Sequence, residues 1–413
     1  MADTGASGTA GPEPEESVSA EDAGQGRAIS GSSPGLRAYL RYFLGLGTWG
    51  FGGPIATVGY MQRDLVERRG WMDEEDFLNG VALGQTMPGP LAAQVVMWVG
   101  FLRRGWLGAL ATAAVFIAPS FVGVLSVAIV YVRYSGLPVV QSLFYGIAPA
   151  VMAIIAVAAG KLGRMTNRKD ARLWAISLVV GLVTAITGAE VAVLFIAAGL
   201  LMIVLDAPPR RLARLSRRGA SALLLPVLAR PARALGTAAA GAGTLVALGL
   251  FFLKAGAFIF GSGLAIVPFL REGVVVQHHW LTDRQFLDAV AIGLITPGPV
   301  VITATFIGYL VAGFPGALVA TAAIFAPIYA GVVLPGSWFV RHKDNPQIKA
   351  FVRGATAAAA GAIAGAVYVL TRQTVTDWAT AGIALAALAV VLRFKNKEPF
   401  IVALGAVAGL LLH

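Results

Sequence analysis

Hydrophobic residues form long runs along this chain, and short polar stretches separate the runs. A helix needs about 20 apolar residues to cross a hydrocarbon core roughly 30 Å thick. The first four runs of that length cover residues 42–61, 77–102, 106–132 and 137–160. A fifth run, 173–205, exceeds one span and predicts two short helices joined by a turn. The pattern therefore predicts an all-α polytopic membrane protein.

Two polar segments interrupt this pattern. Residues 1–35 contain no aromatic residue and no apolar period, which is typical of a disordered acidic tail. The tail lacks the basic start and apolar core of a signal peptide, and we expect it on the cytoplasmic side. Residues 206–233 contain seven arginines and no acid after Asp206. This linker is expected in the cytoplasm, where it can lie on anionic lipid.

The apolar pattern repeats. Phe51 aligns with Phe260, and the register holds without a gap through Pro90 and Pro299; after one deletion it continues to Gly146 and Gly354. The sequence thus predicts a first transporter repeat over 36–205 and a second over 254–413. Between the linker and the second repeat, 234–253 forms an extra apolar segment, expected as a spanning helix whose counterpart is the polar tail. The expected total is about 13 transmembrane segments.

Basic loops indicate how the two repeats are oriented. In the first repeat they follow the second and fourth spans, at Arg103 and at 161–172. In the second repeat they follow the third and fifth spans, at 341–349 and 393–397. Since positive loops face the cytoplasm, this change of phase predicts inverted repeats, and an odd extra span between them agrees with inversion.

Composition excludes several classes of protein. Hydrophobic residues make up 57% of the chain and charged residues 13%, which is typical of a membrane protein. The net charge of +11 lies in loops between apolar runs, so we expect no nucleic-acid partner. Cysteine is absent, the four histidines do not form a ligand set, and no catalytic or nucleotide-binding motif occurs. We therefore expect no enzyme activity, no cofactor and no metal.

A Pro-Gly-Pro tripeptide occurs at the middle of two matched runs, as Pro88-Gly89-Pro90 and as Pro297-Gly298-Pro299. Proline interrupts an α-helix, and an interrupted helix is tolerated in a bilayer where the freed backbone faces protein or water. We expect each span to continue across the membrane after its break. The helix that starts there would offer free N–H groups and a partial positive charge to an anion. These donors are the N–H groups of Leu91, Ala92, Ala93, Val300, Val301 and Ile302. The alternative is an ordinary proline kink.

Further candidates lie near the two breaks. Glycines let a ligand approach the backbone, which points to Gly52 and Gly53 in the first repeat and to Gly261, Ser262 and Gly263 in the second. Close helix packing is the alternative for these residues. Hydroxyl and amide groups could donate to an anion, which adds Thr86, Gln94, Thr296 and Thr303. The alternative for the threonines is a hydrogen bond to their own helix.

Intramembrane charge is sparse. Asp288 lies near the start of its run, and its counterpart in the first repeat is Asn79. An ionisable group in a span is by default a functional candidate, but this position near the membrane interface favours a plain anchor.

These motifs resemble the chromate ion transporter family in its long, two-domain form. The resemblance rests on Phe51-Gly52-Gly53, on 77–90 and on 286–303, and it extends over both repeats. It implies a membrane carrier that exports chromate and handles sulfate, with antiparallel halves. Thr86 and Met87 depart from the residues common in the family, which leaves the substrate preference open.

The resulting hypothesis is a secondary transporter in a bacterial inner membrane that exports chromate and confers chromate resistance. The alternative is a transporter or exchanger of sulfate or a related oxyanion. Expected partners are the anion and the lipid bilayer, and a homo-oligomer is compatible with the sequence. The membrane potential favours export, because moving two charges across 100 mV is worth about 4.6 kcal/mol.

Overall fold

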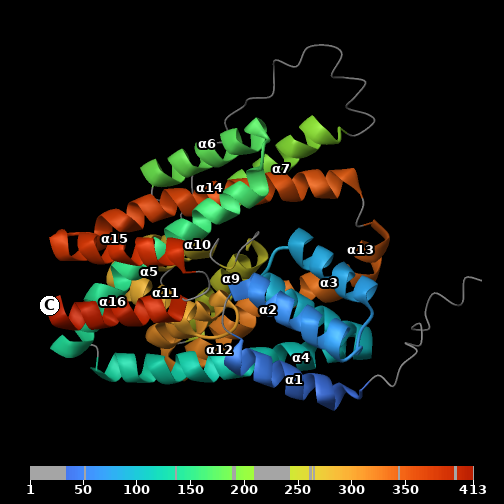
Figure 1. The fold of residues 1–413 in the computed structure, drawn as a ribbon, viewed down its shortest axis with the longest axis horizontal. Coiled ribbons are helices and arrows are strands. Elements are labelled where there is room, and N and C mark those ends of the chain that lie inside the picture. Colours follow the sequence, from blue (N-terminus) through green and yellow to red (C-terminus); the bar gives the residue numbers. More distant parts are fainter. Residues whose placement is uncertain are drawn as a thin grey trace, which may run out of the picture.

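A computed structural model describes residues 34–50, 53–134, 137–187, 192–208, 242–259, 263, 266–342, 345–394 and 398–412. The described residues form helices joined by turns (Figure 1). Gly52, Gly261 and Ser262, three of the candidate site residues, lie outside the described part.

The helices repeat in the same order in both halves. The first half contains α1 (Leu36–Trp49), α2 (Gly53–Met61), the π-helix η1 (Gln62–Arg68), α3 (Glu74–Thr86), α4 (Leu91–Tyr134), α5 (Pro138–Asn167), α6 (Ala171–Thr187) and α7 (Ala192–Asp206). The second contains α9 (Ala242–Ala257), α10 (Ile266–Arg271), the π-helix η3 (Glu272–Gln277), α11 (Asp283–Ile295), the 3₁₀ turn η4 (Val300–Ile302), α12 (Thr303–Val333), α13 (Gly336–His342), α14 (Pro346–Thr374), α15 (Trp378–Arg393) and α16 (Glu398–Leu412). In the register of the sequence, α9 corresponds to α1. The segment expected as an extra helix therefore has a described counterpart.

Four described helices are long and apolar enough to cross a membrane: Leu91–Tyr134, Pro138–Asn167, Val300–Val333 and Pro346–Thr374. Shorter apolar helices of 10–17 residues accompany them. The all-helical expectation is confirmed for the described residues, and the helices fit a membrane protein. The total of 13 spans stays a prediction.

Two of these long helices fold back on themselves. In α4 the backbone leaves helical geometry at Arg104 and Gly105, with φ of −147° and 56°. In α12 it does so at the register-equivalent Ala312 and Gly313, with φ of −145° and 62°. Thr112 Oγ1 then donates to the Val96 carbonyl oxygen at 3.0 Å across the first bend. The positive φ at each glycine allows the reversal, so each segment is a pair of packed helices.

The Pro-Gly-Pro tripeptides also reverse the chain. Trp98 Nε1 of α4 donates to the Asp76 carbonyl oxygen of α3 at 2.9 Å, and a Cβ on Gly84 would collide with Leu91. The segment 77–102 is therefore a helical hairpin. We expected a span that continues across the membrane after a central break, and that prediction was wrong. An apolar run of this length fits either one continuous span or two short helices packed together. The glycine between the prolines has a positive φ, which allows the chain to reverse.

The helices on either side of the glycine-rich segment of the first repeat also fold back on each other. Tyr42 OH of α1 lies 3.4 Å from both the Tyr60 carbonyl oxygen and Asp64 Oδ2, and Tyr39 OH donates to the Trp71 carbonyl oxygen at 2.6 Å. Helix α1 therefore runs antiparallel to α2 and η1. The expected single span 42–61 is therefore wrong, because this range holds the end of α1 and the whole of α2, which run in opposite directions.

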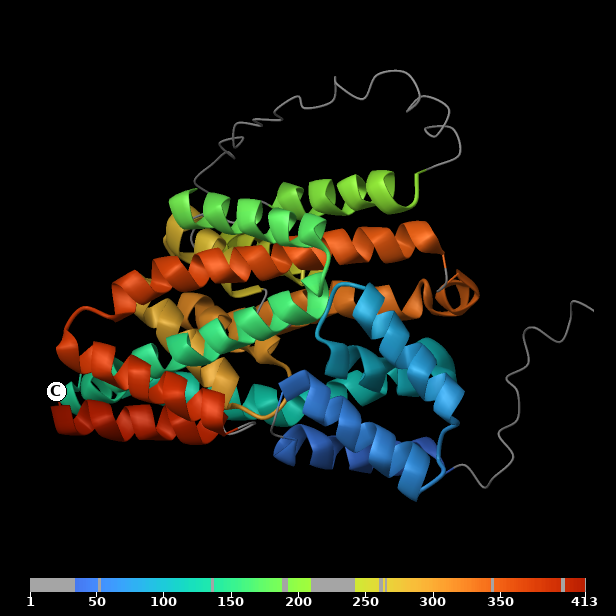
Figure 2. The same cartoon turned by 45° about the horizontal axis from the view of Figure 1, so that its top comes forward.

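The halves exchange helical hairpins (Figures 1 and 2). Helices α6 and α7 pack on α14 of the second half, where a Cβ on Gly354 would collide with the Ala198 backbone. Helices α15 and α16 pack on α5 of the first half, where the register-equivalent Gly146 abuts Gly405 in the same way. Helices α5 and α14, which correspond to each other, run in opposite directions (Figure 2). The pattern of contacts is thus reciprocal between the halves.

Candidate functional site

The first Pro-Gly-Pro turn (Pro88, Gly89, Pro90) lies against the second half of the molecule. Its Gly89 has φ of 143°, which side-chain-bearing residues rarely adopt. The Gly89 N–H donates to the carbonyl oxygen of Ile259 at 2.6 Å. A Cβ at Gly89 would collide with the Gln94 amide and with Ile328 of α12. The turn is therefore held by both its own hairpin and the other repeat.

The second Pro-Gly-Pro turn (Pro297, Gly298, Pro299) lies against the first half. Gly298 has φ of 106°, and a Cβ there would collide with Ser120 of α4. Ser120 Oγ donates to the Pro297 carbonyl oxygen at 2.5 Å. Ser120 was not among the candidates. Ser120 follows the duplicated Ala118-Pro119, and its equivalent in the second repeat is Ile328. The second turn thus packs on Ser120 and the first turn on Ile328, which are equivalent positions of the two repeats.

Helix N-termini follow both turns, but they differ. Helix α4 begins at Leu91, directly after Pro90. The second repeat first makes the 3₁₀ turn η4, in which the Ile302 N–H donates to the Pro299 carbonyl oxygen at 3.0 Å. Ile302 is therefore not a free donor, contrary to the expectation. The hairpins also bring the C-termini of α3 and α11 to the same turns, so carbonyl oxygens lie near each N-terminus.

Gln94 covers those carbonyl groups in the first repeat. Its side chain is fully buried, and Nε2 donates to the Met87 and Pro88 carbonyl oxygens at 3.2 and 3.0 Å. Its Oε1 is buried without a hydrogen-bond partner. The amide N–H groups are thus used by the turn. Gln94 braces the turn, and it does not present these donors to an anion.

The candidate threonines use their protons locally. Thr86 Oγ1 donates to the Ala82 carbonyl oxygen at 2.8 Å and Thr296 Oγ1 to that of Ile292 at 2.7 Å. Thr303 Oγ1 donates to the Val300 carbonyl oxygen at 2.8 Å. This geometry favours the alternative interpretation, in which each hydroxyl bonds a backbone carbonyl oxygen one turn earlier in the chain.

One glycine-rich segment approaches a turn. A Cβ on Gly263 would lie 3.5 Å from Val300 Cβ, directly after Pro299. The structure therefore brings Gly263 to the second Pro-Gly-Pro turn. Gly53 is the first residue of α2.

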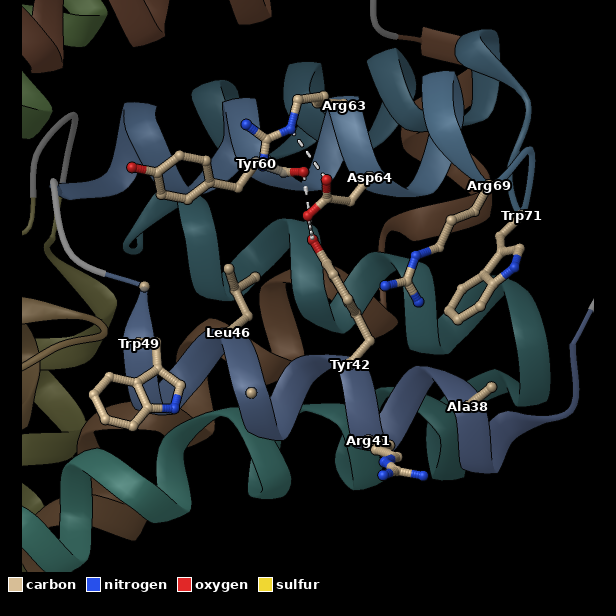
Figure 3. Close-up of a pocket in the computed structure, with 12 residues that line it drawn as sticks. Ala38, Arg41, Tyr42, Leu46, Trp49, Tyr60, Arg63, Asp64, Arg69 and Trp71 are labelled. Atoms are coloured by element: carbon tan, nitrogen blue, oxygen red, sulfur yellow. Dashed lines mark hydrogen bonds and ion pairs between the residues drawn. The ribbon is translucent and has the colours of Figure 1, made fainter.

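A cleft of about 590 Å³ opens between α1 and the α2–η1 segment (Figure 3). It contains three arginines, Arg41, Arg63 and Arg69, and one acid, Asp64. Asp64 accepts from Arg63 Nε at 3.1 Å, and the Arg69 guanidinium lies 4.6 Å from the Trp71 ring centroid. The cleft extends along α1 as far as Gly50. Its lining is therefore cationic and aromatic.

The corresponding region of the second repeat is filled. Phe251 replaces Tyr42, and its ring stacks on Phe269 at 5.6 Å and meets Trp280 at 5.9 Å. Gly273 replaces Asp64, and a Cβ there would collide with Phe251. The two repeats therefore share a backbone arrangement, but the open cationic cleft belongs to the first repeat.

Comparison with known proteins identifies the family. The chromate transporter family model matches residues 38–204 and 246–410. The chain is 50% identical to a chromate transport protein of Cupriavidus metallidurans over 379 residues, which cover 92% of this chain and 93% of that protein. It is 47% identical to a probable chromate transport protein of Synechococcus elongatus, over 91% and 95% of the two chains. It is 30% identical to a chromate transport protein of Pseudomonas aeruginosa, over 86% of each.

No solved structure matches the chain. The two matched segments begin within α1 and α9, one residue apart in the register of the duplication. The relatives are named as transport proteins, which indicates a transporter and not an enzyme. The chain belongs to the chromate transporter family.

Proposed function

We propose that this protein is a secondary transporter that exports chromate across a bacterial inner membrane. The observation that carries this proposal is the reciprocal placement of the two Pro-Gly-Pro turns. Each turn contacts the opposite repeat at a matching position, Ile328 for Gly89 and Ser120 for Gly298. A movement of one repeat against the other therefore changes both turns together. Alternating access in repeat-built transporters uses such a movement around a central site.

The proposed anion site is the pair of turns with the helix N-termini that follow them. An N-terminus carries roughly half a positive charge, and free N–H groups such as that of Leu91 suit an oxyanion. Gln94 supports this role indirectly, because its amide neutralises the Met87 and Pro88 carbonyl oxygens that would repel an anion. A site built from backbone dipoles holds a dianion without a fixed cation, so the anion can also leave.

We propose the cationic cleft as the path by which the anion approaches. Arg41, Arg63 and Arg69 line it, and it ends at Gly50, the first residue of the glycine-rich segment of the first repeat. Clefts of one charge sign raise the local concentration of oppositely charged ligands. Salt should therefore slow transport more in the native protein than in an Arg41→Gln variant.

The proposed topology has inverted repeats and a cytoplasmic N-terminal tail, and the hairpins within 42–61 and 77–102 make the number of spans smaller than the 13 expected. The opposite directions of α5 and α14 support inversion, and the arginines around the α1–α2 hairpin support a cytoplasmic location for that end. The chain has no cysteine, so single cysteines report topology directly. Arg69→Cys and His278→Cys occupy equivalent positions and should react with an impermeant maleimide from opposite sides of the membrane. Reaction from one side only would contradict inversion.

Flux in vesicles tests the transport proposal. Everted vesicles should accumulate radiolabelled chromate when the lumen is made positive, because two negative charges gain about 4.6 kcal/mol per 100 mV. Flux that ignores the sign of the potential would replace this mechanism by electroneutral exchange. Unlabelled sulfate as competitor decides the alternative: strong inhibition by equimolar sulfate would favour a general oxyanion transporter.

A further inference from the structure

Asp288 is a buried carboxyl group in the interior of α11. Its side chain is 2% exposed, and Tyr131 OH of α4 donates to Asp288 Oδ2 at 2.7 Å. The Tyr131 ring is held by Phe144 and Phe306, whose ring centroids lie 5.4 and 5.1 Å away. The sequence predicts that Asp288 is an anchor at the membrane interface. That interpretation was wrong, because the carboxyl group is enclosed by residues from both repeats.

This pair breaks the symmetry of the two repeats. In the register of the duplication, Asn79 corresponds to Asp288 and Phe339 corresponds to Tyr131. Asn79 and Phe339 are also buried, at 6% and 1% exposure. At equivalent positions, the first repeat therefore has the amide of Asn79 and the second repeat has the carboxyl group of Asp288. Packing alone does not require a carboxyl group at this point of the fold.

Water can reach the pair through a cavity of about 210 Å³. The cavity extends from Thr282 and Gln285, which cap the start of α11, to Asp288 and Tyr131. At a share of roughly 30 Å³ per water molecule, this volume holds several waters. A buried carboxyl group with a path to water is the arrangement found in proton relays of membrane transporters.

Few other charged groups face this carboxyl group. Arg284, one turn earlier on α11, lines the same cavity, and its Nη2 donates to the Gln141 carbonyl oxygen at 3.1 Å. The cavity residues from α5 are Val140, Gln141 and Phe144, none of which titrates.

The remaining charges on neighbouring helices have other partners or lie at helix ends. Arg271 of α10 pairs with Asp283 at 2.8 Å, and Glu272 of η3 accepts from Gln277 at 3.1 Å. Arg133 of α4 lies over the Tyr134 ring. Helix α12 carries no charged residue, and α16 carries one, at its first residue, Glu398. Within the described ranges, Asp288 is thus the acid that faces this cavity.

We infer that Asp288 and Tyr131 form a proton-binding site whose occupancy is linked to anion binding at the second Pro-Gly-Pro turn. Asp288 lies seven residues before the end of α11 at Ile295, and Pro297 follows two residues later, so at 1.5 Å per residue the two are roughly 13 Å apart. At that distance and an effective dielectric constant of about 20, an ionised carboxylate weakens the binding of a dianion by roughly two orders of magnitude. A proton taken from cavity water onto the carboxylate removes this repulsion. By reciprocity, the anion favours protonation of Asp288 to the same extent.

This inference rests on the proposed function, and the test separates the two. Chromate affinity is measured for the purified native protein and for Asp288→Asn between pH 5 and pH 9. Protonation of chromate itself affects both proteins equally at each pH. It therefore cancels in the ratio of the dissociation constant of the native protein to that of Asp288→Asn, and this ratio reports the protonation of the protein alone. The ratio should fall from at least tenfold at high pH to about one at low pH. A ratio that does not change with pH overturns the inference.

Two variants guard against a general loss of structure. Tyr131→Phe recreates the residue of the second repeat, Phe339, and should shift the pH at which the ratio changes. Asp283 lies on the same helix but pairs with Arg271. The ratio of the dissociation constants of the native protein and Asp283→Asn should therefore stay at one from pH 5 to pH 9. Infrared difference spectra between the native protein and Asp288→Asn should show a carboxyl band that titrates in this range. If the native protein binds no chromate, the transport proposal fails, and the infrared titration still decides whether Asp288 binds a proton.

Discussion

Ser120 Oγ donates a 2.5 Å hydrogen bond to the carbonyl oxygen of Pro297, 177 residues later in the chain. This bond ties the α4 helix of the first repeat to the Pro-Gly-Pro turn of the second. The equivalent position in the second repeat is Ile328, which contacts the first turn through apolar atoms alone. The two turns are therefore held at matching places by different chemistry.

Ser120→Ala should lower transport while leaving the fold intact. The substitution leaves the half-buried Pro297 carbonyl oxygen without this donor, which costs about 1–3 kcal/mol. We expect a five- to hundredfold loss of chromate flux in everted vesicles. Ser126→Ala is the matched control, since Ser126 lies on the same helix, is exposed and bonds its own backbone. Equal flux in both variants would contradict a role for the tie.

Gly89→Leu and Gly298→Leu should each abolish transport. Both glycines have positive φ, and both lack room for a Cβ. A side chain there forces the turn to rearrange, at a cost of at least 1–2 kcal/mol from the backbone alone. Gly123→Leu on α4 is the control, because nothing lies within 4 Å of its Cβ position. Membrane insertion is checked by immunoblot. Normal chromate flux in either variant would show that its turn is not part of the anion site.

Gln94→Met should weaken anion binding more than it slows the transport step. Methionine keeps the volume but donates nothing to the Met87 and Pro88 carbonyl oxygens. Their negative ends then face the site, so we expect KM for chromate to rise about tenfold, which corresponds to about 1.4 kcal/mol. Kinetics of flux over a range of chromate concentrations separate KM from maximal rate. A fall in maximal rate with unchanged KM would show that Gln94 acts only on the structure.

Labelling tests the hairpin that joins α3 to α4. Cysteines at Glu74 and at Arg104 should react with an impermeant maleimide from the same side of the membrane. A span that continued past the Pro-Gly-Pro turn would place them on opposite sides. The cysteine-free sequence means that each variant carries a single thiol.

Asp377 should make stability depend on acid pH. It caps α15, accepting from the Thr380 N–H at 2.8 Å and from Tyr145 OH at 2.7 Å, and these bonds lower its pKa from 3.8 to about 2. Because the folded state has the lower pKa, the stabilisation is complete above about pH 4 and is lost as pH falls towards 2. The unfolding temperature of the native protein should therefore fall more between pH 4 and pH 2 than that of Asp377→Asn. Parallel curves would exclude this contribution.

The sequence predicted the duplication well, because identity at fixed spacing is a direct signal. Phe51 and Phe260 set a register that the helices follow in both halves, including the two π-helices. It also placed both helix ends at the Pro-Gly-Pro positions. It did not predict the reversals, since an apolar run of 26 residues such as 77–102 suits one long span or two packed short helices equally.

Side-chain roles near the site were predicted less well. The sequence shows that Gln94 is an amide, but its partners depend on how the turn folds back. Asp288 lies five residues after the start of α11, which suggests an interface. Its burial comes from Tyr131, 157 residues away, and no local pattern contains that contact.

The exchange of hairpins between the halves has a consequence for synthesis. Helices α6 and α7 leave the ribosome long before α14, the helix on which they pack. The end of α7 at Asp206 and the start of α14 at Pro346 are 140 positions apart. At a synthesis rate of about 5–20 residues per second, the delay is roughly 7–30 s. During that time lipid must cover the glycine-lined faces that later join the halves. The first half therefore waits as an incomplete assembly, and its final structure is acquired only when the second half arrives.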